Sequence, residues 1–176
     1  MDINKINEER HEVLEGISKD LENEMVASVL RTATDDENSP EILTVDFDEL
    51  GLGHDSVLGE FYFYPVTSDE DTVGLFSSVL TVAEEIPEEN LPAVYEAISV
   101  LNFHILTGAF GVSKDRRFLA YKQCVTYSLD MTKEELRKHV DITMGNVVST
   151  VDQWVDMVIR ISEGEGNVED VLDALG

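Results

Sequence analysis

Apolar residues recur at spacings of three, four and seven positions through the first part of the chain, and they predict one amphipathic helix over residues 3–31. Charged residues such as Glu8, Glu12 and Lys19 fill much of the opposite side. Pro40 cannot continue a helix, and the acidic run before it favours a solvent-exposed loop. The apolar stripe consists of Ile3, Ile6, Val13, Leu14, Ile17, Leu21, Met25 and Val29.

From residue 41 to residue 86 the apolar pattern changes to a period of two, which is typical of strands. The first strand is predicted around residues 43–47. A second, over residues 57–66, carries four consecutive aromatic residues at positions 61–64, and a third covers residues 73–86. Short loops join the three strands, so we expect an antiparallel meander.

The second half of the chain returns to helical spacing over residues 91–106, with Asn90 as the candidate N-cap. A hairpin over residues 107–112 and 118–129 follows. Apolar residues then recur every three or four positions over residues 132–162, and Asp130 stands just before this predicted helix. Such a helix would be about 46 Å long. Because a compact domain of this size is roughly 30–35 Å across, we expect one end of the helix either to overhang or to meet a second copy of the chain in a homodimer.

The predicted element order is therefore α-β-β-β-α-β-β-α. Strands and helices do not alternate regularly, so the fold class is α+β, with an antiparallel five-stranded sheet packed against helices. We expect a single α+β domain over residues 1–163. Residues 164–176 are expected to be an acidic C-terminal tail that includes a short helix at residues 168–175.

The charge of the chain is extreme. Its 176 residues include 37 acids against 12 Lys and Arg, for a formal net charge of −25. So acidic a surface repels phosphate groups, which argues against nucleic acid and anionic membranes as partners. The single cysteine cannot form an internal disulfide, the first residues lack the apolar core of a signal peptide, and no apolar run is long enough to span a membrane. We therefore expect a cytoplasmic protein.

No constellation of residues indicates a catalytic, metal or cofactor site. The four histidines are scattered, without the spacing of zinc ligands. An EF-hand beginning at Asp46 fails because Leu50 and Val57 occupy two ligand positions. Glycine-rich phosphate-binding loops are missing as well. Cys124 lies in a predicted strand, where a free cysteine is usually a small buried apolar residue.

Several segments are similar to a known protein family. The residues are Leu101-Asn102-Phe103-His104, Gly108-Ala109-Phe110-Gly111-Val112, Phe118-Leu119-Ala120-Tyr121, and the closing helix with Val151-Asp152 inside it. Together with the element order over residues 40–162, they resemble the YbjN family of bacterial sensory-transduction regulators, whose members share the fold of type III secretion chaperones. The resemblance implies a non-enzymatic, dimeric binding protein that holds a partner segment on its sheet or helix faces, and it supplies no active-site residues.

The best candidate for a partner-binding surface comes from the second strand. Tyr62 and Tyr64 alternate with Phe61 and Phe63, so the tyrosines should face the other side of the sheet, in line with Leu58 and Val66. If helices cover only one side of the sheet, then Leu58, Tyr62, Tyr64 and Val66 form an exposed apolar patch of the kind that marks an interaction site. The alternative is that the first helix covers these tyrosines.

Three hypotheses for the function follow. The first is a chaperone-like or regulatory adaptor that buries an apolar segment of a protein partner, while its acidic rim attracts basic partners. The second is an acidic mimic of nucleic acid that occupies a basic protein, and the third is an enzyme or small-ligand protein without a recognisable motif. Apolar capture should depend weakly on salt, whereas a nucleic-acid mimic should lose its partner as the salt concentration rises.

Overall fold

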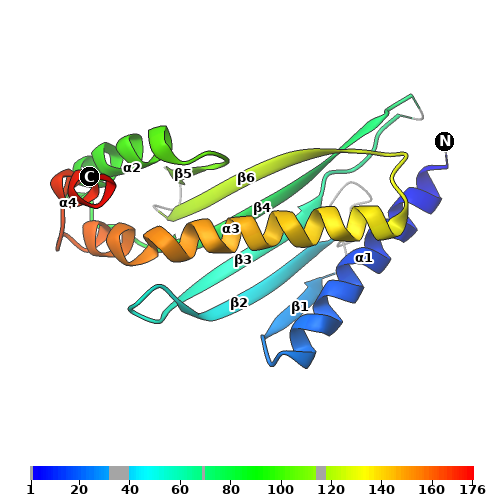
Figure 1. Cartoon of the computed structure of the whole chain (residues 1–176), viewed down its shortest axis with the longest axis horizontal. Coiled ribbons are helices and arrows are strands. Elements are labelled where there is room, and N and C mark those ends of the chain that lie inside the picture. The colour runs from blue at the N-terminus through cyan, green and yellow to red at the C-terminus, as the bar shows by residue number, and fades with distance from the viewer. Residues whose placement is uncertain (1, 32–39, 69, 114–117) are drawn as a thin grey trace. The chain divides into compact units, whose positions relative to one another are not determined.

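The computed structural model describes residues 2–31, 40–68, 70–113 and 118–176. Its helices and strands have an α+β arrangement, in which runs of strands are separated by helices (Figure 1). In chain order they are α1 (Ile3–Asn23), β1 (Ser28–Arg31), β2 (Ile42–Leu50), β3 (Asp55–Phe63), β4 (Val73–Ala83), α2 (Leu91–His104), β5 (Ala109–Val112), β6 (Leu119–Ser128), α3 (Lys133–Ser162) and α4 (Val168–Leu175).

The strands form one antiparallel sheet in the order β1-β2-β3-β4-β6-β5. At one edge, Val29 of β1 pairs with Thr44 of β2, and at the other, Phe110 of β5 pairs with Tyr121 of β6. The predicted α+β class and antiparallel sheet are confirmed. The predicted strand number is wrong, because the sheet has six strands rather than five.

The extra strand comes from the end of the predicted first helix, which stops at Asn23 instead of continuing to residue 31. Met25 adopts a left-handed backbone conformation with φ 64°. The amide of Met25 donates to the carbonyl of Glu22 (3.1 Å), and that of Val26 donates to the carbonyl of Leu21 (2.9 Å). These two bonds form a Schellman C-cap, so the chain reverses and its next residues become β1.

The structure divides into two compact units, each built from three stretches of chain. Unit 1 comprises residues 1–46, 59–78 and 124–146, and unit 2 comprises residues 47–58, 79–123 and 147–176. Strands β2, β3, β4 and β6 and helix α3 each contribute one part to each unit.

In unit 1, helices α1 and α3 lie on the same side of the strands (Figure 1). Arg10 of α1 is buried, and its guanidinium lies 5.3 Å from the ring centroid of Phe63 and 5.6 Å from that of Tyr127. His139 of α3 also faces Tyr127, with 6.4 Å between ring centroids. Both helices therefore pack on the face of the sheet that carries Phe63 and Tyr127. We call this the helix face.

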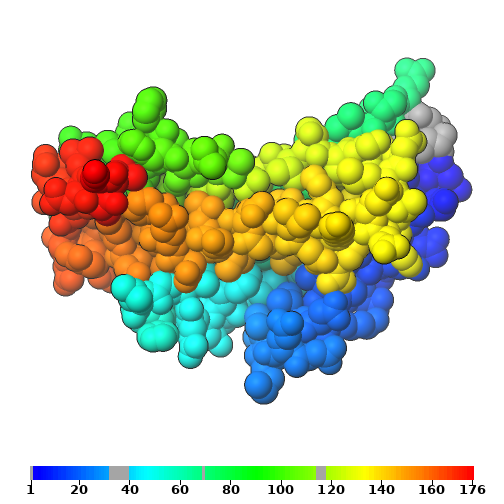
Figure 2. Space-filling view, viewed as in Figure 1, coloured from blue at the N-terminus to red at the C-terminus, as the bar shows by residue number. Residues whose placement is uncertain are grey.

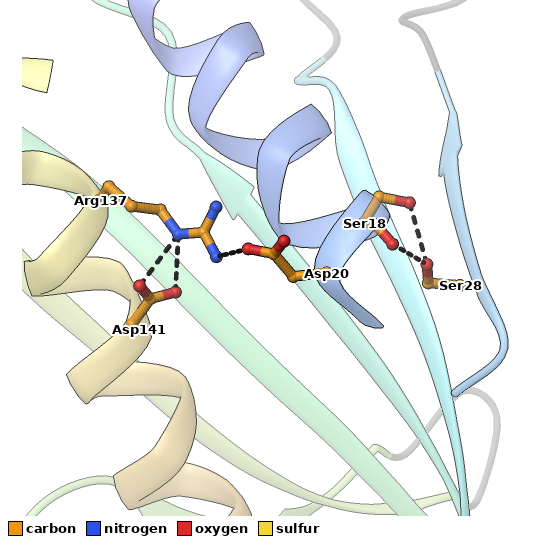
Figure 3. Close-up of polar contacts among 5 residues, drawn as sticks. All are labelled: Ser18, Asp20, Ser28, Arg137 and Asp141. Atoms are coloured by element: carbon orange, nitrogen blue, oxygen red, sulfur yellow. Dashed lines mark hydrogen bonds and ion pairs between the residues drawn. The ribbon is translucent and has the colours of Figure 1, made fainter. Parts of the chain in front are cut away.

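Ion pairs and hydrogen bonds fix α1 to its neighbours in unit 1 (Figure 3). Arg137 of α3 binds Asp20 of α1 (2.8 Å) and Asp141 of its own helix (2.8 Å). The hydroxyl of Ser28 in β1 lies 2.9 Å from the hydroxyl of Ser18 and donates to the Ser18 carbonyl (3.3 Å). The end of α1 is thus held from both sides.

In unit 2, α4 packs on α2, and its Val171 is fully buried. Residues 164–176, set apart as a tail on sequence grounds, thus contain a helix with a buried side chain. The Asn167 side chain accepts a hydrogen bond from the amide of Glu169, and the Asp170 carboxylate accepts one from the amide of Asn167. These two reciprocal bonds make a capping box at the start of α4.

Asn90 stands at the N-cap position of α2, as predicted, but it makes no side-chain capping bond there. Its side-chain amide group donates instead to the carbonyl of Ser162 (3.0 Å). Helix α3, expected to begin just after Asp130, is capped by Thr132. The amide of Thr132 donates to the Glu135 carboxylate (2.8 Å), and the amide of Glu135 donates to the Thr132 hydroxyl (3.3 Å).

The turn between β2 and β3 is held by two carboxylates of α3. The amide of Gly51 donates to Asp152 (2.8 Å), while the amides of Leu52 and Gly53 donate to Asp156 (2.9 and 2.6 Å). Gly51 has φ 70°, and a Cβ at this position would lie 2.6 Å from Asp156. The position therefore needs glycine for its backbone conformation and for space.

Candidate functional site

The side of the unit 1 sheet opposite the helix face exposes apolar and aromatic side chains. Val73 and Leu75 of β4 are 52% and 39% exposed, and they alternate with Gly74 and Phe76, which are buried. Phe76 packs on Phe63 of the helix face, with 5.0 Å between ring centroids. Alternation along each strand therefore defines the open face, whose members in unit 1 include Val29, Tyr62, Tyr64, Val73, Leu75 and Cys124.

Tyr62 and Tyr64 form the centre of the candidate site predicted from the sequence. Their rings are edge to face, with 5.3 Å between centroids, and their hydroxyl oxygens are 3.4 Å apart. Both side chains are half-buried, and burial is the main cause that raises the pKa of Tyr62 above its ordinary value of 10.0. Tyr62 is therefore a neutral hydrogen-bonding group at neutral pH.

The four predicted site residues are brought together only in part. Tyr62 and Tyr64 lie in unit 1 on the open face, opposite the buried Phe61 and Phe63. Leu58 is 41% exposed and belongs to unit 2. Val66 lies beyond the end of β3 at Phe63, and it is half-buried. The tyrosine pair is thus the part of the prediction that the structure assembles on one face.

Helix α1 does not cover the tyrosines, contrary to the alternative considered from the sequence. Its Arg10 stacks on Phe63 and Tyr127 of the helix face. The guanidinium also binds the backbone next to β3, because its NH1 group donates to the carbonyl of Tyr64 (3.1 Å). Arg10 therefore fixes the β3 segment that carries the tyrosine pair from the opposite side of the sheet.

Cys124 is exposed, whereas a cysteine in a strand was expected to be buried. It lies on the open face because Tyr127 and Gln123 of the same strand point to the other side, where both are buried. The strand pattern at residues 119–128 predicts the alternation, but it does not show which of the two faces the helices leave open.

The open face continues into an apolar pocket at the turn between α1 and β1. This α1–β1 pocket has a volume of about 490 Å³, and its walls include Met25, Val26, Ala27 and Val29. The carboxylate-bearing residues Glu22 and Asp46 also line it. Sequence reasoning missed the pocket because the helical spacing runs on through Met25 and Val29 and conceals the reversal of the chain.

Unit 2 has exposed apolar side chains of its own, and the most exposed are Leu52 in the β2–β3 turn, Phe103 near the end of α2 and Leu106 just after it. Phe103 and Leu106 are almost fully exposed, and Phe103 contacts the His104 ring at 5.5 Å between centroids. No group of three or more His, Cys, Asp or Glu within the described ranges is arranged to hold a metal ion. Among the helices that the structure describes, none has the length and apolar character needed to cross a membrane.

Comparison with known proteins finds similarity to solved structures. One is the structure of YbjN, a proposed transcription regulator from E. coli, which is 16% identical in sequence. The structural alignment covers 80% of this chain and 89% of the YbjN chain, with a TM-score of 0.41. An uncharacterised protein from Methanothermobacter thermautotrophicus is 19% identical, covers 88% of this chain and 99% of that chain, and has a TM-score of 0.46. No family model and no curated protein matches the sequence. YbjN, which names the family that the sequence resembles, is thus also among the solved structures similar to this chain.

Proposed function

We propose that this chain is a non-enzymatic, chaperone-like or adaptor protein that holds a segment of a protein partner on the open face of unit 1. The observation that carries the proposal is the exposure of Val73 and Leu75 beside the half-buried Tyr62–Tyr64 pair. Contiguous exposed apolar side chains mark interaction surfaces. Tyrosine suits such a surface because its ring is buried on binding while its hydroxyl bonds to a polar group.

The partner segment should combine apolar side chains with Lys or Arg. The chain has a net charge of −25, and several positive side chains on the helices of unit 1 already form ion pairs with acids of the same unit. Lys19 pairs with Glu15, Lys133 with Glu12, and Arg137 with Asp20 and Asp141. The remaining acids give the surface a negative potential, which accelerates association with basic partners and disfavours acidic ones.

Cys124 provides a direct test, because it is the single cysteine and lies on the open face. A benzophenone maleimide attached to Cys124 is activated by light in lysate of the source organism, and the adducts are identified by mass spectrometry. We expect adducts with a segment that contains apolar and basic residues. These adducts should also form when the lysate is irradiated at a high salt concentration. Leu75→Asp should abolish them, because a charge in the middle of the face cannot be buried.

A matched control moves the cross-linker to another exposed position. In the double variant Cys124→Ser, Ser99→Cys, the reagent sits on α2 in unit 2. The same adducts from both positions would contradict the proposal, as would adducts only with a second copy of this chain. Adducts with a basic protein that no longer form when the lysate is irradiated at moderate salt would instead favour the nucleic-acid mimic.

A further inference from the structure

The α1–β1 pocket is held in shape by bonds from three sides. The Schellman cap fixes the turn at Met25 and Val26. Ser28 is bound to Ser18 at the end of α1 (Figure 3). The amide of Asp46 in β2 donates to the carbonyl of Ala27 (2.9 Å), so the pocket's β2 side is joined to the turn. In the space-filling view, this α1–β1 segment, in blue, reaches the molecular surface (Figure 2). The pocket is therefore formed before any ligand arrives.

Met25 lines the pocket in a backbone conformation that costs stability. It adopts φ 64°, where any side chain with a Cβ is disfavoured and glycine is the usual residue. The side chain is 94% exposed, so packing within the chain does not explain it. Methionine is common at adaptable binding surfaces because its thioether chain is flexible and polarizable. A costly, exposed methionine at the wall of a preformed pocket is best explained by contact with another molecule.

The charges around the pocket select the kind of side chain that enters it. Among the residues that the structure describes, its lining contains Glu22 and Asp46 but no Lys, Arg or His. Its apolar walls can accommodate an aliphatic group, and the negative charge of its two acidic residues attracts a cation. Lys and Arg meet both needs, since their methylene stems lie along apolar surfaces while the charged end remains hydrated or paired. The volume of about 490 Å³ falls in the range of about 300–1,000 Å³ that is common for ligand pockets.

We propose that the α1–β1 pocket receives a lysine or arginine side chain of the partner segment, whose apolar residues lie on the open face. Met25 and Val29 contact the methylene stem, and Glu22 and Asp46 hold the charged end. Val29 belongs to both the pocket and the open face, so one extended segment can occupy the two together. This inference rests on the proposed function and adds the feature of the partner that specifies the register of binding.

The methyl group of Met25 makes the pocket visible to NMR. The full chain is labelled with ¹³C at the methionine methyl groups, and the Met25 signal is assigned with Met25→Leu. Two probes are compared: a synthetic peptide in which Leu and Val alternate with Lys, and the same peptide with every Lys Nε-acetylated. We expect the Lys peptide to shift the Met25 signal and to bind at least tenfold more tightly, because acetylation removes the charge while it retains the stem.

Matched variants separate this site from general electrostatic attraction. The double variant Glu22→Gln, Asp46→Asn should weaken the Lys peptide at least tenfold. Glu8→Gln, Glu134→Gln removes the same charge from exposed positions of unit 1 outside the pocket and should weaken it less than threefold. Equal losses in the two variants would overturn the inference.

The outcomes also distinguish this inference from the proposed function. If both peptides bind and protect Cys124 from maleimide while the Met25 signal stays in place, the pocket inference is wrong and the open-face proposal stands. If neither peptide shifts Met25 or protects Cys124, and Cys124 gives no specific adducts in lysate, both proposals are wrong. Circular dichroism of each variant excludes unfolding as the cause of a loss.

Discussion

The guanidinium of Arg10 is buried and makes its contacts with aromatic and backbone groups. Its Nε donates to the hydroxyl of Tyr127 (2.6 Å) and its NH1 group to the carbonyl of Tyr64 (3.1 Å). The rings of Phe63 and Tyr127 face the guanidinium, so cation–π attraction adds to these bonds. Arg10 thus joins α1 to the strand that carries the tyrosine pair.

We expect Arg10→Ala to lower the free energy of unfolding by about 2–4 kcal/mol, because it removes two charge-assisted hydrogen bonds and leaves a void. Arg10→Met keeps most of the volume and removes the buried charge, so it should cost less than half as much. Urea unfolding followed by circular dichroism measures both. Equal losses would show that the polar contacts, not the filled volume, dominate.

The raised pKa values of three tyrosines predict a fall in stability at alkaline pH. Burial is the main cause that raises the pKa of Tyr62, Tyr121 and Tyr127 above the ordinary value of 10.0. The folded state therefore holds these protons more tightly than the unfolded state does. Their contribution to stability is complete below pH 10.0 and is lost as the pH rises through the folded pKa values. Ultraviolet absorbance should show these tyrosines ionising above pH 10.0, together with unfolding, and ionisation of all five tyrosines near pH 10.0 without unfolding would contradict this.

Alternation along the strands predicts which residues share a face, but not which face is covered. Tyr62 and Tyr64 lie opposite Phe61 and Phe63 as expected. The burial of Arg10 was not predictable, because its neighbours Glu8, Glu9 and Glu12 mark that part of the helix as polar. Arg10 is buried there because two aromatic rings that are distant in sequence pack on its guanidinium. The pattern of apolar and polar residues along the helix does not reveal such partners.

At the scale of elements, the end of α1 shows how local backbone chemistry overrides periodicity. Positions 25 and 29 continue the apolar stripe of the helix, and the sequence Asn23-Glu24-Met25 contains no glycine or proline to mark an end. Pairing with β2 decides the outcome, because it places Leu30 opposite the buried Leu43. The other elements were predicted closely because turns or prolines bound them.

The C-cap of α1 yields a stability prediction. Met25→Gly should raise the free energy of unfolding by about 0.5–1 kcal/mol, since glycine relieves the left-handed strain but gains freedom in the unfolded chain. Met25→Ala keeps the Cβ and should not stabilise. Urea unfolding of the three proteins tests this, and equal midpoints for the glycine and alanine variants would contradict it.

The β2–β3 turn gives a second element-scale prediction. Asp156→Ala removes the acceptor of two turn amides, so it should lower the free energy of unfolding by about 1–2 kcal/mol. Glu163→Ala removes one exposed acidic charge beyond the end of α3 and is the matched control. Thermal unfolding of both variants measures the difference. A similar change in the two would mean that relief of charge repulsion outweighs the turn.

At the scale of the whole molecule, the length of α3 supports the expectation of a homodimer. The helix spans 30 residues, about 45 Å, which exceeds the roughly 30–35 Å expected across a compact chain of this size. Light scattering at micromolar concentration should therefore give twice the chain mass of 19.7 kDa. A mass of one chain would contradict the prediction.

The interleaving of the two units has a consequence for how the protein is made. Unit 1 needs residues up to 146, and unit 2 begins at residue 47 but needs the stretch from 147 onward. Domains built from continuous sequence can fold one after another as a ribosome releases them. Here the early strands must wait for β6 and α3, so most of the chain leaves the ribosome before either unit can close. During that interval the apolar strands β2, β3 and β4 are exposed together and could aggregate. The acidic residues next to them oppose aggregation, because their negative charges repel other nascent chains of the same protein.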